Sequence, residues 1–312
     1  MINCFFLGVE GGGTKSRALL ADEDGKIIRD RSGKALNYHA IGEKQTKANL
    51  KELIAPLLKA SNGRGIKTVF GLAGLDTKQD WKIYDGIIKS LLPRNAKYKI
   101  VNDAAIALEA KCPVISKEAG IVAIAGTGAN VYGRSRGKTI RSVGWDFLLG
   151  DEGGSFSAGL KAMHAAMRSW DGRMPKSVFE KSIPKAAGAK NIEGFYHKLY
   201  KVWREDPQNI KYYIASFSHL VDEAILKKDK AALVICDREV KNLSRGIEAV
   251  ARRLKLSKKA FCVGFAGSGW KMPGLKDKVK KSIKKEFPGV YFSKNEDNSG
   301  VVGAIQLARA IH

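Results

Sequence analysis

The chain has few cysteines: Cys4, Cys112, Cys236 and Cys262. They lie far apart in the sequence, with no Cys-x-x-Cys pair and no histidine at metal-ligand spacing. This distribution predicts neither a disulfide framework nor a zinc or iron–sulfur site. We therefore expect reduced thiols and a cytoplasmic location.

Long apolar runs are also missing. No stretch of about 18 apolar residues occurs, and the apolar segment Cys4–Val9 lacks the basic region and cleavage site of an export signal. We therefore expect a protein that is neither exported nor membrane-spanning.

Acidic residues are scarce, with 31 Asp and Glu against 55 Lys and Arg, which gives a formal net charge of +24. A diffuse solvated surface, attraction of anionic ligands and nucleic-acid binding would each explain this excess. No aromatic-interleaved RNA motif, zinc-finger spacing or basic-zipper heptad occurs, so we do not expect nucleic acid as a partner. The densest basic run, Lys276–Lys285, predicts an exposed helix, because Val279, Ile283 and Phe287 recur every four residues.

Strands and helices alternate along the 312 residues, which suffice for two domains of about 100 to 200 residues each. The predicted strands are Asn3–Val9, Ser16–Asp22, Lys26–Arg31, Thr68–Leu72, Tyr98–Val101, Gly120–Ala125, Asn130–Gly133, Thr139–Val143 and Ala260–Gly264. The predicted helices lie around Leu50–Leu58, at Gln79–Leu92, over most of Ser155–Arg253, and at Val301–Ile311. Two halves open with strand, glycine turn and strand, which indicates an internal duplication.

The nucleotide-binding motifs GxGxxG and GxxxxGK[ST] are absent in their required strand-to-helix context. Instead, three glycine turns each follow an apolar strand: Gly11–Gly13, Gly126–Gly128 and Gly267–Gly269. Glycine leaves backbone N–H groups unhindered, so a phosphate can approach them closely. Tight turns require glycine for conformational reasons as well, and each turn alone admits that explanation.

Carboxylates stand near these turns. Asp103 follows a predicted strand and opens a helix, where it could cap the helix or accept a proton from an attacking hydroxyl. Glu10 precedes the first glycine turn and suits a water-bridged Mg²⁺. Asp151 and Glu152 follow Trp145 in a glycine-rich segment that fits either a solvated turn or hydrogen bonds to sugar hydroxyls. Asn37 lies in a predicted loop with Tyr38 and His39.

Four motifs occur in a characteristic order: GVEGGGTKS at Gly8–Ser16, NDAAIAL at Asn102–Leu108, AGTGAN at Ala125–Asn130 and GWDFLLGDEGG at Gly144–Gly154. Together they resemble the N-acetylglucosamine kinase and BadF/BadG/BcrA/BcrD ATPase group of the actin, sugar kinase and Hsp70 superfamily. The resemblance spans essentially the whole chain. Two departures stand out: Tyr38 replaces a tryptophan, and Asp146 replaces a glycine.

This resemblance implies an α/β fold of two actin-like (ribonuclease H-like) domains, each a mixed five-stranded sheet with helices, with ATP and Mg²⁺ in the cleft between them. Residues 1–104 would form the first domain, with a C-terminal helix at about 300–312 packing back on it, and residues 105–299 the larger second one.

The resemblance also implies roles for residues. It makes Asp103 the catalytic base, and Glu10 and Asp103 the metal-associated acids. The nucleotide would contact Gly11, Gly12, Gly13, Thr14, Lys15, Gly126, Thr127, Gly128, Gly267, Ser268 and Gly269. The sugar would contact Asn37, Asn130, Trp145 and Asp151.

The expected activity is ATP-dependent phosphorylation of a hydroxyl of N-acetylglucosamine or a hexose. A 2-keto-3-deoxygluconate kinase is the alternative, and the basic composition favours an anionic substrate. An ATPase activator of the BadF type would need cysteines arranged for an iron–sulfur cluster, which this chain lacks. A non-catalytic ATP-dependent binding protein stays open. We expect a homodimer.

Overall fold

The computed structural model describes residues 4–61, 64–94, 96–113, 119–295 and 299–311. Two compact units divide the chain: residues 1–122 with 293–312, and residues 123–292. The predicted domain division at residues 104/105 and 299/300 stays a prediction. In the compact units, helix α3 (Asp103–Lys111) and Ser293–His312 belong to the first unit.

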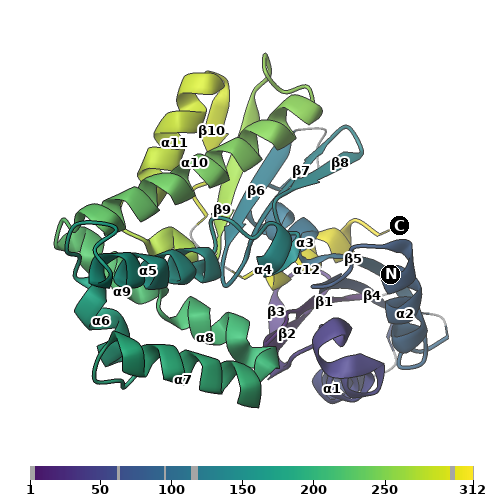
Figure 1. The fold of residues 1–312 in the computed structure, drawn as a ribbon. Helices are drawn as coiled ribbons and strands as arrows, with labels where there is room; N and C mark the ends of the chain where they lie inside the picture. Colours follow the sequence, from purple (N-terminus) through teal and green to yellow (C-terminus); the bar gives the residue numbers. More distant parts are fainter. Residues whose placement is uncertain (1–3, 62–63, 95, 114–118, 296–298, 312) are drawn as a thin grey trace. The chain divides into compact units, whose positions relative to one another are not determined.

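The first unit is built on a five-stranded mixed sheet with the order β3-β2-β1-β4-β5 (Figure 1). Its strands are β1 (Phe5–Gly11), β2 (Lys15–Ala21), β3 (Ile27–Lys34), β4 (Ile66–Leu72) and β5 (Lys97–Asn102). Strands β1, β2 and β3 pair antiparallel, whereas β1, β4 and β5 run parallel. The carboxyl ends of the parallel strands therefore share one edge.

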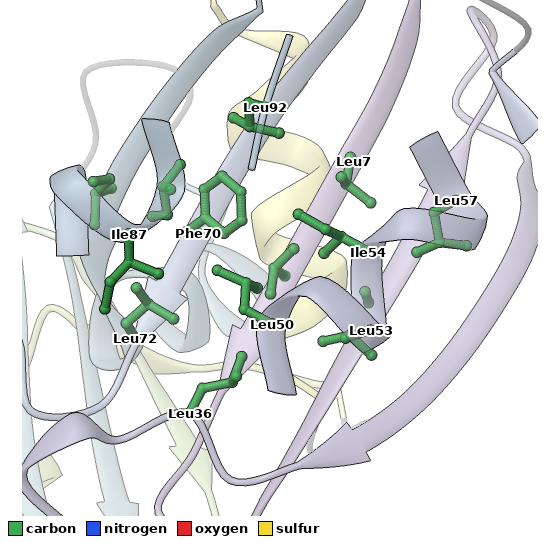
Figure 2. Close-up of a cluster of buried hydrophobic side chains, with 14 of the residues drawn as sticks. Leu7, Leu36, Leu50, Leu53, Ile54, Leu57, Phe70, Leu72, Ile87 and Leu92 are labelled. Atoms are coloured by element: carbon green, nitrogen blue, oxygen red, sulfur yellow. The ribbon is translucent and has the colours of Figure 1, made fainter. Parts of the chain in front are cut away.

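Both faces of this sheet are covered by helices, because successive strand residues point to opposite faces. On one face, Leu7 and Phe70 pack against apolar residues of α1 (Tyr38–Ala60) and α2 (Lys78–Lys89) (Figure 2). On the other face, Phe6 and Val69 pack with α3 and α12 (Val301–Arg309). The C-terminal helix thus completes the core of the first unit.

The second unit has a five-stranded sheet with the order β10-β9-β6-β7-β8. Read from β8, this order corresponds strand for strand to β3-β2-β1-β4-β5 of the first sheet. Its strands are β6 (Gly120–Ala125), β7 (Ala129–Ser135), β8 (Lys138–Ser142), β9 (Phe261–Ala266) and β10 (Val290–Phe292). This matching order agrees with the internal duplication indicated by the sequence. Strand β10 was not predicted, because it spans only three residues.

The second unit's helices are α4 (Asp146–Leu149), α5 (Ser155–Trp170), α6 (Phe179–Ala186), α7 (Ile192–Glu205), α8 (Ile210–Ser216), α9 (Ser218–Leu226), α10 (Lys230–Arg253) and α11 (Leu275–Glu286). They include six, α5 to α10, from the long helical stretch between β8 and β9. Short 3-10 turns occur at η1 (Pro207–Asn209) and η2 (Ser268–Lys271). Helix α11 contains the whole basic run and buries Val279 and Ile283, as its spacing predicted.

The cysteines depart from expectation. Cys4 and Cys236 are free thiols, whereas Cys112 and Cys262 are disulfide-bonded. The expectation of four unpaired cysteines is therefore wrong for two of them, because wide separation in sequence does not prevent pairing in a fold. Within the described residues, no helix is long and apolar enough to cross a membrane.

Candidate active site

The first candidate region lies at the carboxyl edge of the first sheet. In the parallel register, Gly11 lies opposite Leu72, and Leu72 lies opposite Asn102. Strand spacing of about 4.8 Å places the ends of β1 and β5 about 10 Å apart. The first glycine turn and Asp103 therefore lie at the same edge of the first sheet.

The first glycine turn joins β1 to β2 and has a buried base and an exposed tip. A side chain at Gly11 would lie 2.6 Å from Leu72 Cδ2, so this position needs glycine for packing. The Gly12 N–H donates to the Lys15 carbonyl at 3.0 Å and closes the hairpin. Thr14 and Lys15 are exposed, which leaves a hydroxyl and an ammonium group available to an anion.

Asp103 is the first residue of α3 and is not its cap. Asn102 caps the helix, since its side-chain oxygen accepts a hydrogen bond from the Ala104 N–H at 2.9 Å. The Asn102 side-chain amide also donates to the Leu75 carbonyl at 3.2 Å, which ties β5 to the loop after β4. The interpretation of Asp103 as the side-chain cap is therefore wrong; Asp103 lies in the first turn of α3, directly after β5 at the carboxyl edge of the sheet.

Glu10 lies inside the unit rather than at the open edge. Its carboxylate accepts the Val301 N–H at 3.1 Å, at the N-terminus of α12. Burial raises the pKa of Glu10, although backbone hydrogen bonds from Val301 and Gly300 and the nearby Arg17 oppose the rise. A carboxylate at a helix N-terminus is favourable because it meets the positive end of the helix dipole. Glu10 thus has a structural partner besides any role near Mg²⁺.

Asn37 caps α1, because its side chain accepts the His39 N–H at 3.1 Å. The Asn37 Oδ1 atom also lies near Gly74, where an added Cβ would be 2.6 Å away. Asn37 therefore lies beside the loop after β4, at the candidate edge. Tyr38 and His39 begin helix α1, so the prediction that they lie in a loop is corrected; Gly42 interrupts this helix with φ 76°.

Hydrogen bonds to the buried Asp80 side chain hold this segment in place. The Tyr38 hydroxyl and the His39 ring both contact Asp80 at the start of α2, the latter at 3.1 Å. Burial opposes ionisation of Asp80, but hydrogen bonds from Tyr38, Thr77 and the backbone lower its pKa to about 2. The Tyr84 hydroxyl lies 2.8 Å from the Ala73 carbonyl oxygen. Sequence reasoning missed Asp80 and Tyr84, which no motif marks.

The second glycine turn, between β6 and β7, contacts the first residues of α5. The Ser155 N–H donates to the Gly126 carbonyl at 2.8 Å, and the Phe156 N–H donates to the Thr127 carbonyl at 2.9 Å. A Cβ at Gly128 would lie 2.1 Å from Asp151 Oδ2, whereas one at Gly126 would meet nothing closer than 4.0 Å. Gly128 is thus required by packing, while Gly126 has open space beside it.

The third glycine turn packs on the end of β6. Gly267 has φ +97°, and a Cβ there would lie 2.3 Å from the Ala125 carbonyl oxygen. A Cβ at Gly269 would lie 2.9 Å from the same atom. Trp270 is buried just after the turn, and its ring N–H donates to the Ala123 carbonyl at 2.9 Å. The structure therefore brings the second and third turns together within the second unit.

The residues predicted to bind sugar occupy different environments. Asn130 follows the second turn, and its buried Oδ1 atom has no hydrogen-bond partner among the described residues. An unpartnered acceptor of this kind fits a ligand hydroxyl. Trp145 is 59% exposed, and the Arg141 guanidinium stacks on its ring with Cζ 4.4 Å from the ring centroid. Asp151 is buried beside Gly128.

Lys211 from α8 joins two acids of the glycine-rich segment. Its ammonium lies 2.6 Å from Asp146 Oδ1 and 3.0 Å from Asp151 Oδ2. Burial lowers the pKa of Lys211, but the hydrogen bonds to Asp146 and Asp151 outweigh it and hold the pKa above its usual value. Asp146 has φ +65°, a conformation that favours glycine. Aspartate tolerates it better than most residues, so the departure from glycine is accommodated.

Among the described residues, no group of three or more His, Cys, Asp or Glu side chains could hold a metal ion. This does not oppose a nucleotide-bound Mg²⁺, which needs only one or two protein carboxylates besides phosphate oxygens and water. Asp103, at the carboxyl edge near the first glycine turn, fits that donor set, whereas Glu10, whose carboxylate is bonded to the start of α12, would reach such an ion through a bridging water.

The family model of the BadF/BadG/BcrA/BcrD ATPases matches residues 7–308. The chain belongs to this ATPase family. A curated N-acetylmuramic acid/N-acetylglucosamine kinase of Clostridium acetobutylicum is 30% identical over 98% of each chain. A curated N-acetyl-D-glucosamine kinase of Dictyostelium discoideum is 27% identical over 91% of each chain.

Solved structures agree with this family fold. A protein of Porphyromonas gingivalis with the provisional name N-acetylglucosamine kinase has a TM-score of 0.72, covers 99% of each chain and is 20% identical. A glucokinase of the ROK family from Streptomyces griseus, solved with glucose and AMPPNP, has a TM-score of 0.56 at 17% identity, covering 98% of this chain and 99% of that one. The predicted actin-like fold, with two mixed five-stranded sheets, is confirmed.

Sequence reasoning about this ATPase missed Lys211. It lies 60 residues after Asp151, on a short helix, and its neighbours carry no motif. Only the fold brings it to the glycine-rich segment, so no pattern within the sequence could have identified it.

Proposed function

We propose that this ATPase-family member is a kinase that transfers the γ-phosphoryl group of ATP to a hydroxyl of N-acetylglucosamine. The observation that carries the proposal is Asp103, a carboxylate at the carboxyl edge of the first sheet that is not used as a helix cap. The names of both curated relatives support the acceptor. They favour an amino sugar over 2-keto-3-deoxygluconate.

In this proposal the protein mainly aligns the two substrates. Asp103 accepts the proton of the attacking hydroxyl as the new bond to phosphorus forms. The phosphates contact the Lys15 ammonium and those N–H groups of the three glycine turns that are not already bonded within the turns, as those of Gly12 and Gly126 are. Asn37, Asn130 and Asp151 hold sugar hydroxyls. Bound Mg²⁺ supplies charge neutralisation on the phosphate oxygens, with Glu10 and Asp103 as the acids that would hold it.

N-acetylmuramic acid is a second candidate acceptor, because Lys211 lies directly beside Asp151. This sugar carries a lactyl carboxylate, and a cation near the sugar-binding acids would offset its charge. The Lys211 ammonium already bridges two carboxylates, so a substrate carboxylate would have to displace one of them. Asp146 is the one to leave, because its side chain is 68% exposed and can turn into water, whereas that of Asp151 is 7% exposed. The name of the Clostridium acetobutylicum relative supports the same pair of acceptors.

The experiment is an assay of ADP release from the purified protein with ATP and Mg²⁺, repeated with single acceptors. The panel is N-acetylglucosamine, N-acetylmuramic acid, glucose, glucosamine and 2-keto-3-deoxygluconate. We expect release to depend on acceptor and to be fastest with an N-acetylated amino sugar. Release at one constant rate with every acceptor and with none would reject the kinase and favour an ATPase that only binds other molecules.

Two further proposals concern the cell. We propose a cytoplasmic location, where ATP is available to a kinase, and a homodimer as the assembly. Light scattering after size-exclusion chromatography tests the dimer, and a monomeric mass at assay concentration would contradict it.

A further inference from the structure

The second unit contains a cavity remote in sequence from the glycine turns. It has a volume of about 290 Å³ and is lined by residues of α5 and α10 together with Met174 and Pro175. The lining residues are Lys161, His164, Ala165, Arg168, Met174, Pro175, Lys230, Ala231, Val234, Ile235 and Arg238. The volume falls at the lower end of small-molecule sites, which span about 300–1,000 Å³.

The charges of this lining are all of one sign. It includes two arginines, two lysines and a histidine but no acid. Lys161 is neutralised by Glu239, whose Oε1 atom lies 2.6 Å from the ammonium. Arg168, Lys230 and Arg238 form no ion pair with any residue that the structure describes. Arg168, Lys230 and Arg238 are thus exposed cations that line a partly apolar cavity. Arg168 also lies close enough to Asp171 to help lower the pKa of that carboxyl.

Acids near the cavity are engaged elsewhere. Asp171 pairs with Arg173, and Glu180 pairs with Lys176. Asp229 caps α10 by accepting the Ala232 N–H at 3.1 Å and also accepts the Val178 N–H at 3.0 Å. None of these acids forms an ion pair with Arg168, Lys230 or Arg238, so an anion that binds between the cations displaces no acid.

His164 adds a neutral hydrogen-bonding group. Burial lowers its pKa, and the neighbouring Arg168, Lys161 and Arg173 cations lower it further. The imidazole can donate or accept a hydrogen bond without adding to the charge. Arginine forks match phosphate oxygens in a bidentate geometry, whereas apolar residues such as Val234 and Met174 suit the carbon atoms of a small ligand.

We propose that this cavity binds a phosphomonoester of about the size of a sugar phosphate, at a site separate from the catalytic residues. Two arginines from facing helices hold the phosphate, and the apolar wall contacts the rest of the molecule. Since the lining residues of α5 and α10 include none of the predicted catalytic, nucleotide or sugar residues, the site does not depend on the kinase proposal.

Isothermal titration calorimetry with glucose 6-phosphate tests the proposal. The full chain is first saturated with a non-hydrolysable ATP analogue, Mg²⁺ and N-acetylglucosamine, so that phosphate loops are occupied. We expect one equivalent to bind. The Arg168→Gln/Arg238→Gln double variant should weaken binding at least about tenfold, since charge-assisted hydrogen bonds contribute about 1.5–3 kcal/mol each.

The matched control is Arg204→Gln on α7, an exposed arginine outside the cavity, which should change affinity less than about twofold. A second variant, Val234→Glu, places a carboxylate at a half-exposed lining position without disturbing the core, and should also weaken binding about tenfold or more. Absence of binding to the parent protein overturns the proposal. Equal affinity of the parent and both cavity variants also overturns it.

Discussion

The two sheets have the same strand order, yet their glycine hairpins differ. In the first unit, the hairpin after β1 ends in an exposed Thr14 and Lys15. In the second unit, the hairpin after β6 is covered by α5, whose first N–H groups bond to the turn carbonyls of Gly126 and Thr127. Only the first hairpin presents a flexible side-chain cation at its tip.

The difference shows that glycine serves two purposes in these turns. Gly128 and Gly267 are required because the protein itself occupies the space that a side chain would need. Gly126 has no such packing requirement, so we expect its missing side chain to matter for a ligand that approaches the turn. Equivalent positions in a duplicated fold therefore need not have equivalent functions, and substitutions can separate packing from binding.

The largest expected effect belongs to Asp103 at the first sheet edge. Asp103→Asn keeps the size of the side chain and leaves the Asn102 cap intact, so Tm and ATP affinity should stay near parental values. Turnover should fall about 10²- to 10⁴-fold, the range of a general base. Steady-state kinetics and thermal denaturation measure both, with Asp24→Asn, an exposed turn acid, as the control. Turnover above about a tenth of the parental rate would reject the base assignment.

A matched pair of glycine variants comes next and separates the two purposes of the turns. Gly126→Ala should fold with parental Tm, because its Cβ meets no protein atom closer than 4.0 Å, but should bind ATP about 10- to 100-fold more weakly. Gly267→Ala should instead lower Tm by several degrees, because its φ of +97° strains alanine by about 1–3 kcal/mol and its Cβ meets Ala125. Parental ATP affinity in Gly126→Ala would remove that turn from the nucleotide site.

Lys211→Gln tests whether Lys211, in the second unit, affects which sugar the protein phosphorylates. We expect the ratio of kcat/KM for N-acetylmuramic acid to that for N-acetylglucosamine to fall about tenfold, because a charge-assisted contact to the lactyl carboxylate is lost. Lys227→Gln, at an exposed position, serves as control. A fall in both constants with an unchanged ratio would leave Lys211 as a residue that only positions Asp151.

The smallest effect concerns Glu10 and the pH dependence of stability. Its folded-state pKa is raised, so the stability it contributes is fully present below its ordinary pKa and is lost as pH rises through the raised value. Glu10→Gln should therefore reduce the dependence of Tm on pH between the ordinary pKa of a glutamate and the raised pKa of Glu10. Asp30→Asn is the contrasting variant, because Arg17 lowers the pKa of Asp30 and stability there is lost as pH falls. Identical profiles for Glu10→Gln and parent would contradict this explanation.

Much of the fold could be predicted because its signals are local. Apolar runs marked nine of the ten strands that the structure describes, and glycine turns follow three of them. In the long helical stretch, α5 ends before Gly172 and α7 ends before Pro207, whereas Pro184 lies inside α6. Strand β10 was too short to detect, and the disulfide-bonded state of Cys112 depends on distant residues.

The residues of the candidate site likewise fall into two groups: those marked by local sequence motifs and those that only the fold brings together. Asp103 and the glycine turns are recognisable as ordered motifs, and their family is confirmed. Lys211, Asp80 and the cation cavity depend on helices meeting in space, which no window of sequence contains. Whether Asp103 capped α3 was also undecidable from sequence, because Asn102 beside it caps equally well.

The most direct test of the proposed function follows the fate of the phosphoryl group by ³¹P nuclear magnetic resonance. ATP, Mg²⁺ and N-acetylglucosamine are incubated with the full chain, and with Asp103→Asn as a control. We predict a new phosphomonoester resonance that grows in proportion to ADP with the parent protein and far more slowly with the variant. Inorganic phosphate in proportion to ADP, without a phosphomonoester, would contradict the account.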